Sequence, residues 1–141
     1  MALICDTGAV YALYDADDTH HAAAKAVVEN EAGPLLLPVV LLAEIDYLLT
    51  TRLGTDAALD FLDSVALRAF ALVDLSAEDL ARCRELVRQY RGLPLGLADA
   101  SVVATAERLR IQRVFTVDER HFRAIQPRGL GHFILLPADR E

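Results

Sequence analysis

The sequence has no long apolar run, although 54% of its 141 residues are hydrophobic. No stretch approaches the roughly 20 apolar residues that a membrane-spanning helix needs. The amino-terminal segment also lacks the basic region followed by an apolar region that marks a secretory signal. These absences predict a cytoplasmic protein that does not enter a membrane.

Cysteine and lysine are scarce as well. Cys5 and Cys83 stand far apart in apolar surroundings and form no CxxC pair. They predict small buried side chains in a reducing compartment, not a disulfide. Lys25 is the only lysine, so the remaining basic residues are all arginine. Arginine is suited to bidentate phosphate contacts.

Basic residues are fewer than acidic ones, 14 against 21, which gives a net charge of −7. Such a balance argues against a polyanionic partner. The excess of acids is confined to the first half of the chain. Residues 1–70 hold 11 acids and 3 bases, whereas residues 71–141 hold 10 acids and 11 bases. Acids that bind a metal ion would also cease to repel nucleic acid, because the cation offsets them.

Short apolar segments alternate with segments of helical periodicity along the chain. This alternation predicts an α/β fold, with a mostly parallel central sheet of about five strands and helices on both faces, in a single domain spanning residues 1–141. Pro38 is expected near the first position of a helix, and Ser76 with Asp79 predicts a capping box. The expected strands are 2–5, 35–37, 70–75, 113–116 and 132–136.

Acidic residues occupy positions where this fold gathers ligands. Asp6 and Asp118 each follow an expected strand, and ligands of parallel sheets bind outside the carboxyl ends of the strands. Asp99 shares a helix side with Val102, Val103 and Ala106, so it is expected to point inward, with Ser101, Ala104 and Arg108 opposite. Glu44 likewise shares a side with Leu41, Tyr47 and Leu48. A simpler interpretation of Asp99 is an acid in the first helical turn, where the helix dipole favours it.

Four carboxylates without cysteine or histidine suit hard cations such as Mg²⁺ or Mn²⁺. Ions of this kind serve enzymes that cleave or transfer phosphate, by activating water and stabilising the leaving oxygen. Clustered carboxylates repel one another, so at least one of them should have a raised pKa.

The order of these residues resembles that of the PIN-domain nucleases, and of the VapC toxins of bacterial toxin–antitoxin pairs in particular. The resemblance covers nearly the whole chain. It rests on Asp6-Thr7, Ala43-Glu44-Ile45, Leu97-Ala98-Asp99-Ala100 with Ala104-Thr105-Ala106, and Thr116-Val117-Asp118 with His121-Phe122.

The resemblance implies a Mg²⁺- or Mn²⁺-dependent endoribonuclease. Asp6, Asp99 and Asp118 would chiefly bind the metal, and Glu44 would complete the site or orient the water. Thr7 and Thr116 match positions that support the acids by hydrogen bonding. The resemblance also implies a homodimer and a small VapB-type antitoxin whose tail occupies the active-site groove.

A second hypothesis concerns the RNA backbone. The excess of bases in the second half suggests that arginines guide the phosphates to the site. The candidates are Arg108, Arg110, Arg113, Arg120, Arg123 and Arg128.

Other functions fit less well. A receiver domain needs a lysine near its acidic pocket, and Lys25 follows no strand end. A phosphatase of the haloacid dehalogenase type would need an aspartate where Gly8 stands. Two alternatives stay open: a PIN-like module that binds RNA or antitoxin with negligible turnover, and a metal-dependent DNA nuclease.

Overall fold

The computed structural model describes residues 1–139 and contains a five-stranded sheet in the order β3-β2-β1-β4-β5, in which all neighbouring strands are parallel. The predicted α/β fold is therefore confirmed. The strands are β1 (Leu3–Cys5), β2 (Leu35–Pro38), β3 (Ala71–Val73), β4 (Arg113–Phe115) and β5 (Ile134–Leu136). The helices are α1 (Thr7–Tyr14), α2 (His21–Asn30), α3 (Leu41–Leu53), α4 (Thr55–Ala66), α5 (Ala77–Gln89), α6 (Leu97–Leu109) and α7 (Glu119–Ala124).

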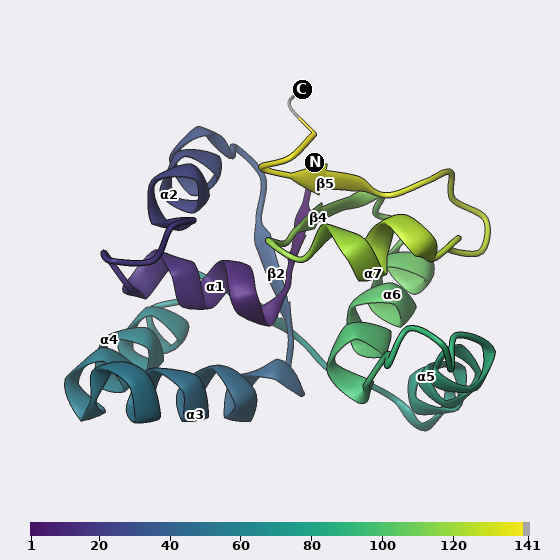
Figure 1. The fold of residues 1–141 in the computed structure, drawn as a ribbon, viewed down its shortest axis with the longest axis horizontal. Coiled ribbons are helices and arrows are strands. Elements are labelled where there is room, and N and C mark those ends of the chain that lie inside the picture. The colour runs from purple at the N-terminus through teal and green to yellow at the C-terminus, as the bar shows by residue number, and fades with distance from the viewer. Residues whose placement is uncertain (140–141) are drawn as a thin grey trace.

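Helices cover both faces of the sheet. Helices α1 to α4 lie on one side of the strands and α5 to α7 on the other (Figure 1). The strand order explains this division. The chain moves outward from β1 to β3, returns across the sheet to β4 and continues to β5, and right-handed crossovers place the connecting helices on opposite faces for the two directions.

The central pair β1 and β4 positions the carboxyl edge of the sheet. Their parallel register sets Cys5 opposite Phe115. All side chains of β1 are buried, as are Val114 and Phe115, so apolar packing fixes this pair at the centre of the core. The residues that follow the two strands, beginning with Asp6 and Thr116, consequently emerge side by side.

The expected helix at Pro38 begins later in the structure. Pro38 is the last residue of β2, where it pairs with Val73, and α3 starts at Leu41. The fixed φ of proline suits an extended strand as well as a first helical turn. Pairing with β3 selects the extended form, and the Val39 amide continues it by donating to the Val73 carbonyl at 2.9 Å.

Helix α6 is more deeply buried than the sequence predicts. Ser101 and Ala104 were expected on a side opposite the core, yet every residue from Ala100 to Ala106 is buried. The helix packs on β1 and β2 with one side and on α5 with the other. Small side chains all round α6 allow both layers to approach it closely.

Cys5 and Cys83 are buried free thiols, as predicted. Among the residues that the structure describes, no helix is both long enough and apolar enough to span a membrane.

Candidate active site

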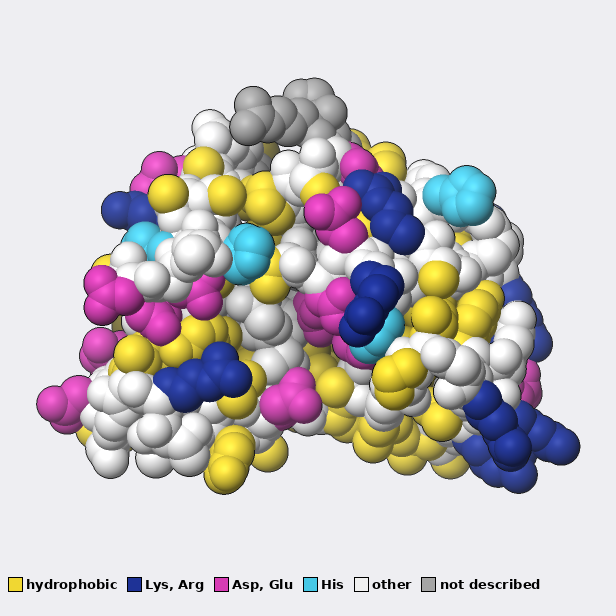
Figure 2. Space-filling view, in the orientation of Figure 1, with side chains coloured by type: hydrophobic (Ala, Val, Ile, Leu, Met, Phe, Trp, Pro, Cys, Tyr) yellow, Lys and Arg dark blue, Asp and Glu magenta, His cyan; other side chains and the backbone are white. Residues whose placement is uncertain are grey.

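Four acidic residues from separate elements face one region at the carboxyl edge of the sheet. Asp6 precedes α1, Asp118 precedes α7, Asp99 is the third residue of α6, and Glu44 lies in the first turn of α3. Charge repulsion links Asp6 to Asp99 and Asp118, and links Asp99 to Asp118 and Glu44. Figure 2 shows acidic side chains gathered at the centre of this face, with a histidine and a basic side chain beside them.

Asp6 is the most buried of these acids, with 5% of its surface exposed. Burial raises its pKa to about 7, and repulsion from Asp99 and Asp118 adds to the effect. The Thr116 hydroxyl opposes it by donating to Asp6 Oδ2 at 2.9 Å, and the Thr7 backbone amide also lowers the pKa. The same Thr116 oxygen accepts the Asp118 amide at 3.0 Å, so one hydroxyl ties Asp6 to the start of α7.

Asp99 and Asp118 share one histidine. His121 Nδ1 lies 2.8 Å from Asp99 Oδ2 and 3.4 Å from Asp118 Oδ2. Burial raises the pKa of Asp99, the His121 contact lowers it, and the charges of Asp118 and Glu44 raise it further. The Asp99 side chain is therefore held inward by a partner, as its helical position predicts, and the Asp118 side chain is 43% exposed.

Glu44 and Thr7 differ from what the sequence suggests. Glu44 was expected on the buried side of its helix, but it is exposed, because α3 buries the face formed by Leu41, Ile45 and Leu49. Glu44 nevertheless acts on the charge of Asp99. The Thr7 hydroxyl is buried and makes no hydrogen bond within the described part of the chain, so only its backbone amide supports Asp6.

The acids fit a hard divalent cation by their chemistry. The charges of neighbouring acids raise the pKa of Asp6 and of Asp99, and a cation bound among the carboxylates would relieve that repulsion. Within residues 1–139, no three side chains of His, Cys, Asp or Glu are already spaced to hold a metal ion. Binding through Asp6, Asp99 and Asp118 therefore requires at least one of these side chains to approach the others.

Most of the candidate RNA-binding arginines have partners within the protein. Arg113 is buried against Glu31 at 2.6 Å, at the opposite end of β4 from the acids, so it is not placed to contact a phosphate at the site. Arg120 is exposed, two residues after Asp118, and makes no hydrogen bond or ion pair with the described residues. The remaining four pair as follows: Arg108 with Asp79, Arg110 with the Gly129 carbonyl, Arg123 with Asp139 and Glu119, and Arg128 with Glu85.

His121 is the site residue that sequence reasoning missed. It was noted only as part of a motif with Phe122. The available signal was its spacing, because a residue three positions after Asp118 lies on the same side of a helix. Its contact with Asp99 depends on how α6 and α7 pack, which local sequence does not reveal.

Comparison with known proteins identifies the family of the chain. Residues 3–126 match the family model of the PIN domain. Ribonuclease VapC26 of Mycobacterium tuberculosis is 36% identical over 135 residues, which cover 96% of this chain and all of the relative.

Solved structures share the fold. The crystal structure of VapC20 of M. tuberculosis, a toxin that cleaves the sarcin–ricin loop, superposes with a TM-score of 0.76 at 22% identity, over 82% of this chain and 89% of that one. VapBC2 of Rickettsia felis, solved bound to a DNA fragment from its promoter, gives a TM-score of 0.66 at 19% identity, over 96% of this chain and 97% of that one. The matched family model and the sequence relative together show that the chain belongs to the PIN-domain family.

Proposed function

We propose that this protein is a Mg²⁺- or Mn²⁺-dependent endoribonuclease that acts as the toxin of a type II toxin–antitoxin system. The observation that carries the proposal is the buried Asp6, held among Asp99 and Asp118 with a pKa raised to about 7. Such an arrangement is unfavourable for a structural residue and useful for binding a divalent cation. The names of the relatives, ribonuclease VapC26 and VapC20, support RNA as the substrate.

Each acid has a proposed role. Asp6, Asp99 and Asp118 hold the metal, and Glu44, exposed at the start of α3, orients the attacking water or completes the metal site. A divalent ion supplies the positive charge that lowers the pKa of a water molecule and stabilises the leaving oxygen. Because water attacks in place of the ribose 2′-hydroxyl, we expect products with a 5′-phosphate and a 3′-hydroxyl.

Arg120 is our first candidate for contact with the RNA backbone. It is exposed beside Asp118 and is not engaged by an acid of the described chain. Arg108, Arg110, Arg123 and Arg128 would have to share or exchange their present partners to bind a phosphate.

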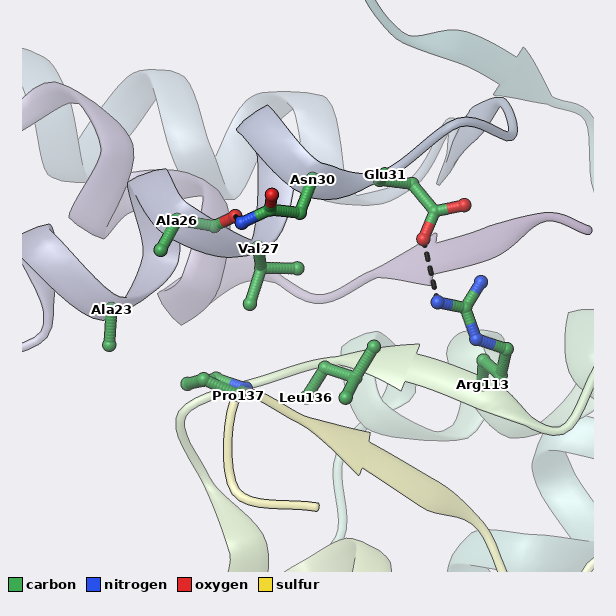
Figure 3. Close-up of a pocket in the computed structure, with 8 residues that line it drawn as sticks. All are labelled: Ala23, Ala26, Val27, Asn30, Glu31, Arg113, Leu136 and Pro137. Atoms are coloured by element: carbon green, nitrogen blue, oxygen red, sulfur yellow. Dashed lines mark hydrogen bonds and ion pairs between the residues drawn. The ribbon is translucent and has the colours of Figure 1, made fainter. Parts of the chain in front are cut away.

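A groove that extends away from the acids, toward the Glu31–Arg113 ion pair, offers a place for the antitoxin. It has a volume of about 610 Å³ between α2 and β5, and Ala23, Val27, Leu136 and Pro137 form its apolar walls (Figure 3). A second hollow of about 280 Å³ shares Ala23 and Pro137 with the first and reaches Thr116. Together they connect the site to a surface of small apolar residues, which suits an extended peptide such as the tail of a VapB-type antitoxin.

Homodimerisation is supported by the surface around β3, the strand at one edge of the sheet. Leu72 is 46% exposed on this strand, and the helices before and after it in the chain, α4 and α5, carry exposed leucines and valine. Helix α4 also carries exposed acids, and exposed arginines lie on α5 and just after it, so a contact between α4 of one copy and α5 of the other would set opposite charges together. The exposed residues are Leu59, Leu62, Asp56, Asp60 and Asp63 on α4, Leu80, Val87, Arg84 and Arg88 on α5, and Arg91 two residues after α5.

Cleavage of structured RNAs tests the proposed reaction. We expect the purified protein to cut RNA with Mg²⁺ or Mn²⁺ and to lose this activity when the metal is chelated. Asp99→Asn should reduce the rate by at least about 100-fold, because it removes a metal-binding charge. Asp17→Asn, which neutralises an exposed acid between α1 and α2, should leave the rate unchanged.

The two alternatives give different results in the same assay. Equal activity with and without chelator would exclude the metal mechanism. RNA binding without cleavage under all metal conditions would indicate the non-catalytic module, and preferential cleavage of DNA of matched sequence would indicate a DNA nuclease. Thermal melting of each variant shows whether the substituted protein still folds.

A further inference from the structure

His121 occupies an unusual position between two of the acids. It lies in α7, the short helix that follows Asp118, and only 11% of its side chain is exposed. One ring nitrogen, Nδ1, faces Oδ2 of both Asp99 and Asp118. A single buried group thus contacts the carboxylate of Asp99 in α6 and that of Asp118, which precedes α7.

The contact between His121 and Asp99 joins two helices, unlike the contact between His121 and Asp118, which lies within one helical turn. A histidine three residues after Asp118 can reach that acid in any helix start. Here the shorter distance, 2.8 Å, joins His121 to Asp99, which is 22 residues away in the chain and belongs to α6. The ring therefore fixes the start of α7 against the first turn of α6.

The second ring nitrogen indicates that apolar packing does not explain this residue. His121 Nε2 is buried and makes no hydrogen bond to the part of the chain that the structure describes. A buried polar atom without a partner is unfavourable, and an apolar ring such as that of the adjacent Phe122 would avoid it. What an apolar ring cannot provide is the Nδ1 contact with the two carboxylates.

We propose that His121 is a positioning residue that fixes the Asp99 and Asp118 carboxylates in the orientation in which they receive a divalent cation. Because the ring contacts Oδ2 of each acid, it leaves Oδ1 of each for the ion. This inference rests on the proposed metal-dependent function. Hydrogen-bonded neighbours of metal-binding carboxylates commonly contribute 10- to 100-fold in metal affinity.

Mn²⁺ binding to the full-length protein tests the proposal, with free Mn²⁺ followed by electron paramagnetic resonance. We expect His121→Phe, which keeps a ring but removes both nitrogens, to weaken Mn²⁺ binding by about 10-fold or more. His121→Asn should restore affinity to within about threefold of the unsubstituted protein, because its amide nitrogen lies near the place of Nδ1. His132→Phe, at an exposed histidine, is the matched control and should bind normally.

The outcomes separate this inference from the proposed function. If the unsubstituted protein binds Mn²⁺ and His121→Phe binds it equally or more tightly, the positioning role is wrong and the metal site stands. If His121→Asn is as impaired as His121→Phe, the nitrogen is not the essential feature and the inference is again wrong. If the unsubstituted protein does not bind Mn²⁺, both proposals fail together.

Discussion

At the scale of single residues, the site depends on a carboxyl group kept in an unfavourable place. Asp6 is buried at the end of β1, and its neighbours Asp99 and Asp118 carry charge of the same sign. One hydroxyl, from Thr116, and the Thr7 amide stabilise its ionised form. They do not offset the burial, so the pKa stays near 7 and a substantial fraction of Asp6 is protonated in the metal-free protein in neutral solution.

This pKa predicts how the stability of the metal-free protein depends on pH. The folded-state pKa of Asp6 is about 7, above the ordinary value of 3.8, so folding favours the protonated acid. Its contribution is complete below pH 3.8 and is lost as the pH rises through 7. Between pH 5 and pH 8 the free energy of unfolding should fall by on the order of 2–4 kcal/mol on account of Asp6.

Urea unfolding in the presence of chelator measures this effect. Asp6→Asn cannot ionise, so it should remove most of the fall and be more stable than the unsubstituted protein at pH 8. Asp17→Asn, at an exposed position, should keep the full pH dependence. An Asp6→Asn variant that retains the same dependence would show that another group causes it.

Sequence reasoning located the acids better than it located their partners. Asp6 and Asp118 could be found because acids after parallel strands meet at one edge, and Asp99 because of its place in the helical repeat. Glu44 was placed on the wrong face because α3 is apolar nearly all round, so periodicity alone did not identify its buried side. The contact between His121 and Asp99 depends on the packing of two helices, which no local pattern encodes.

At the scale of elements, the local sequence was sufficient to predict features that depend on neighbouring backbone groups, such as helix caps. The capping box predicted from Ser76 and Asp79 is confirmed: the Asp79 amide donates to the Ser76 hydroxyl at 3.1 Å, and the Ser76 amide donates to Asp79 Oδ2 at 3.0 Å. Tertiary packing decided the remaining cases. Pairing with β3 extended Pro38 into a strand, and a second layer of helix covered Ser101 and Ala104.

The cap of α5 yields a stability prediction. Ser76→Ala removes the hydroxyl that accepts the Asp79 amide, so we expect a loss of about 1 kcal/mol in the free energy of unfolding. Thr51→Ala is the control, because that exposed hydroxyl donates to carbonyls of its own helix. Urea unfolding compares the two. Equal effects of both substitutions would mean that the capping bonds contribute nothing measurable.

At the scale of the whole molecule, the alternation of strands and helices was enough to predict the parallel sheet, and its right-handed crossovers explain the division of the helices between the faces. The surface could not be predicted in the same way. The exposure of Leu72 on the edge strand β3, and of the acids on α4 and the arginines on α5, becomes visible only in the folded chain.

This edge predicts the oligomeric state. We expect light scattering after size exclusion to give twice the chain mass of 15.4 kDa. Leu72→Glu should shift the protein to monomer, because it buries a charge at the proposed centre of the contact. Leu109→Glu, at an exposed leucine of α6, is the control and should remain a dimer. A monomeric unsubstituted protein, or a dimeric Leu72→Glu, would contradict the proposed interface.

The hydrogen bond between Thr116 and Asp6 joins residues 110 positions apart in the chain. During translation, Asp6 leaves the ribosome long before Thr116 and Asp118 are synthesised, and β1 lacks its partner β4 until then. A nascent chain therefore has an incomplete set of acids for almost the whole of its synthesis. A nascent chain of the proposed nuclease would therefore be unable to cut the message from which it is being translated, and products that end before Thr116 would lack the complete site.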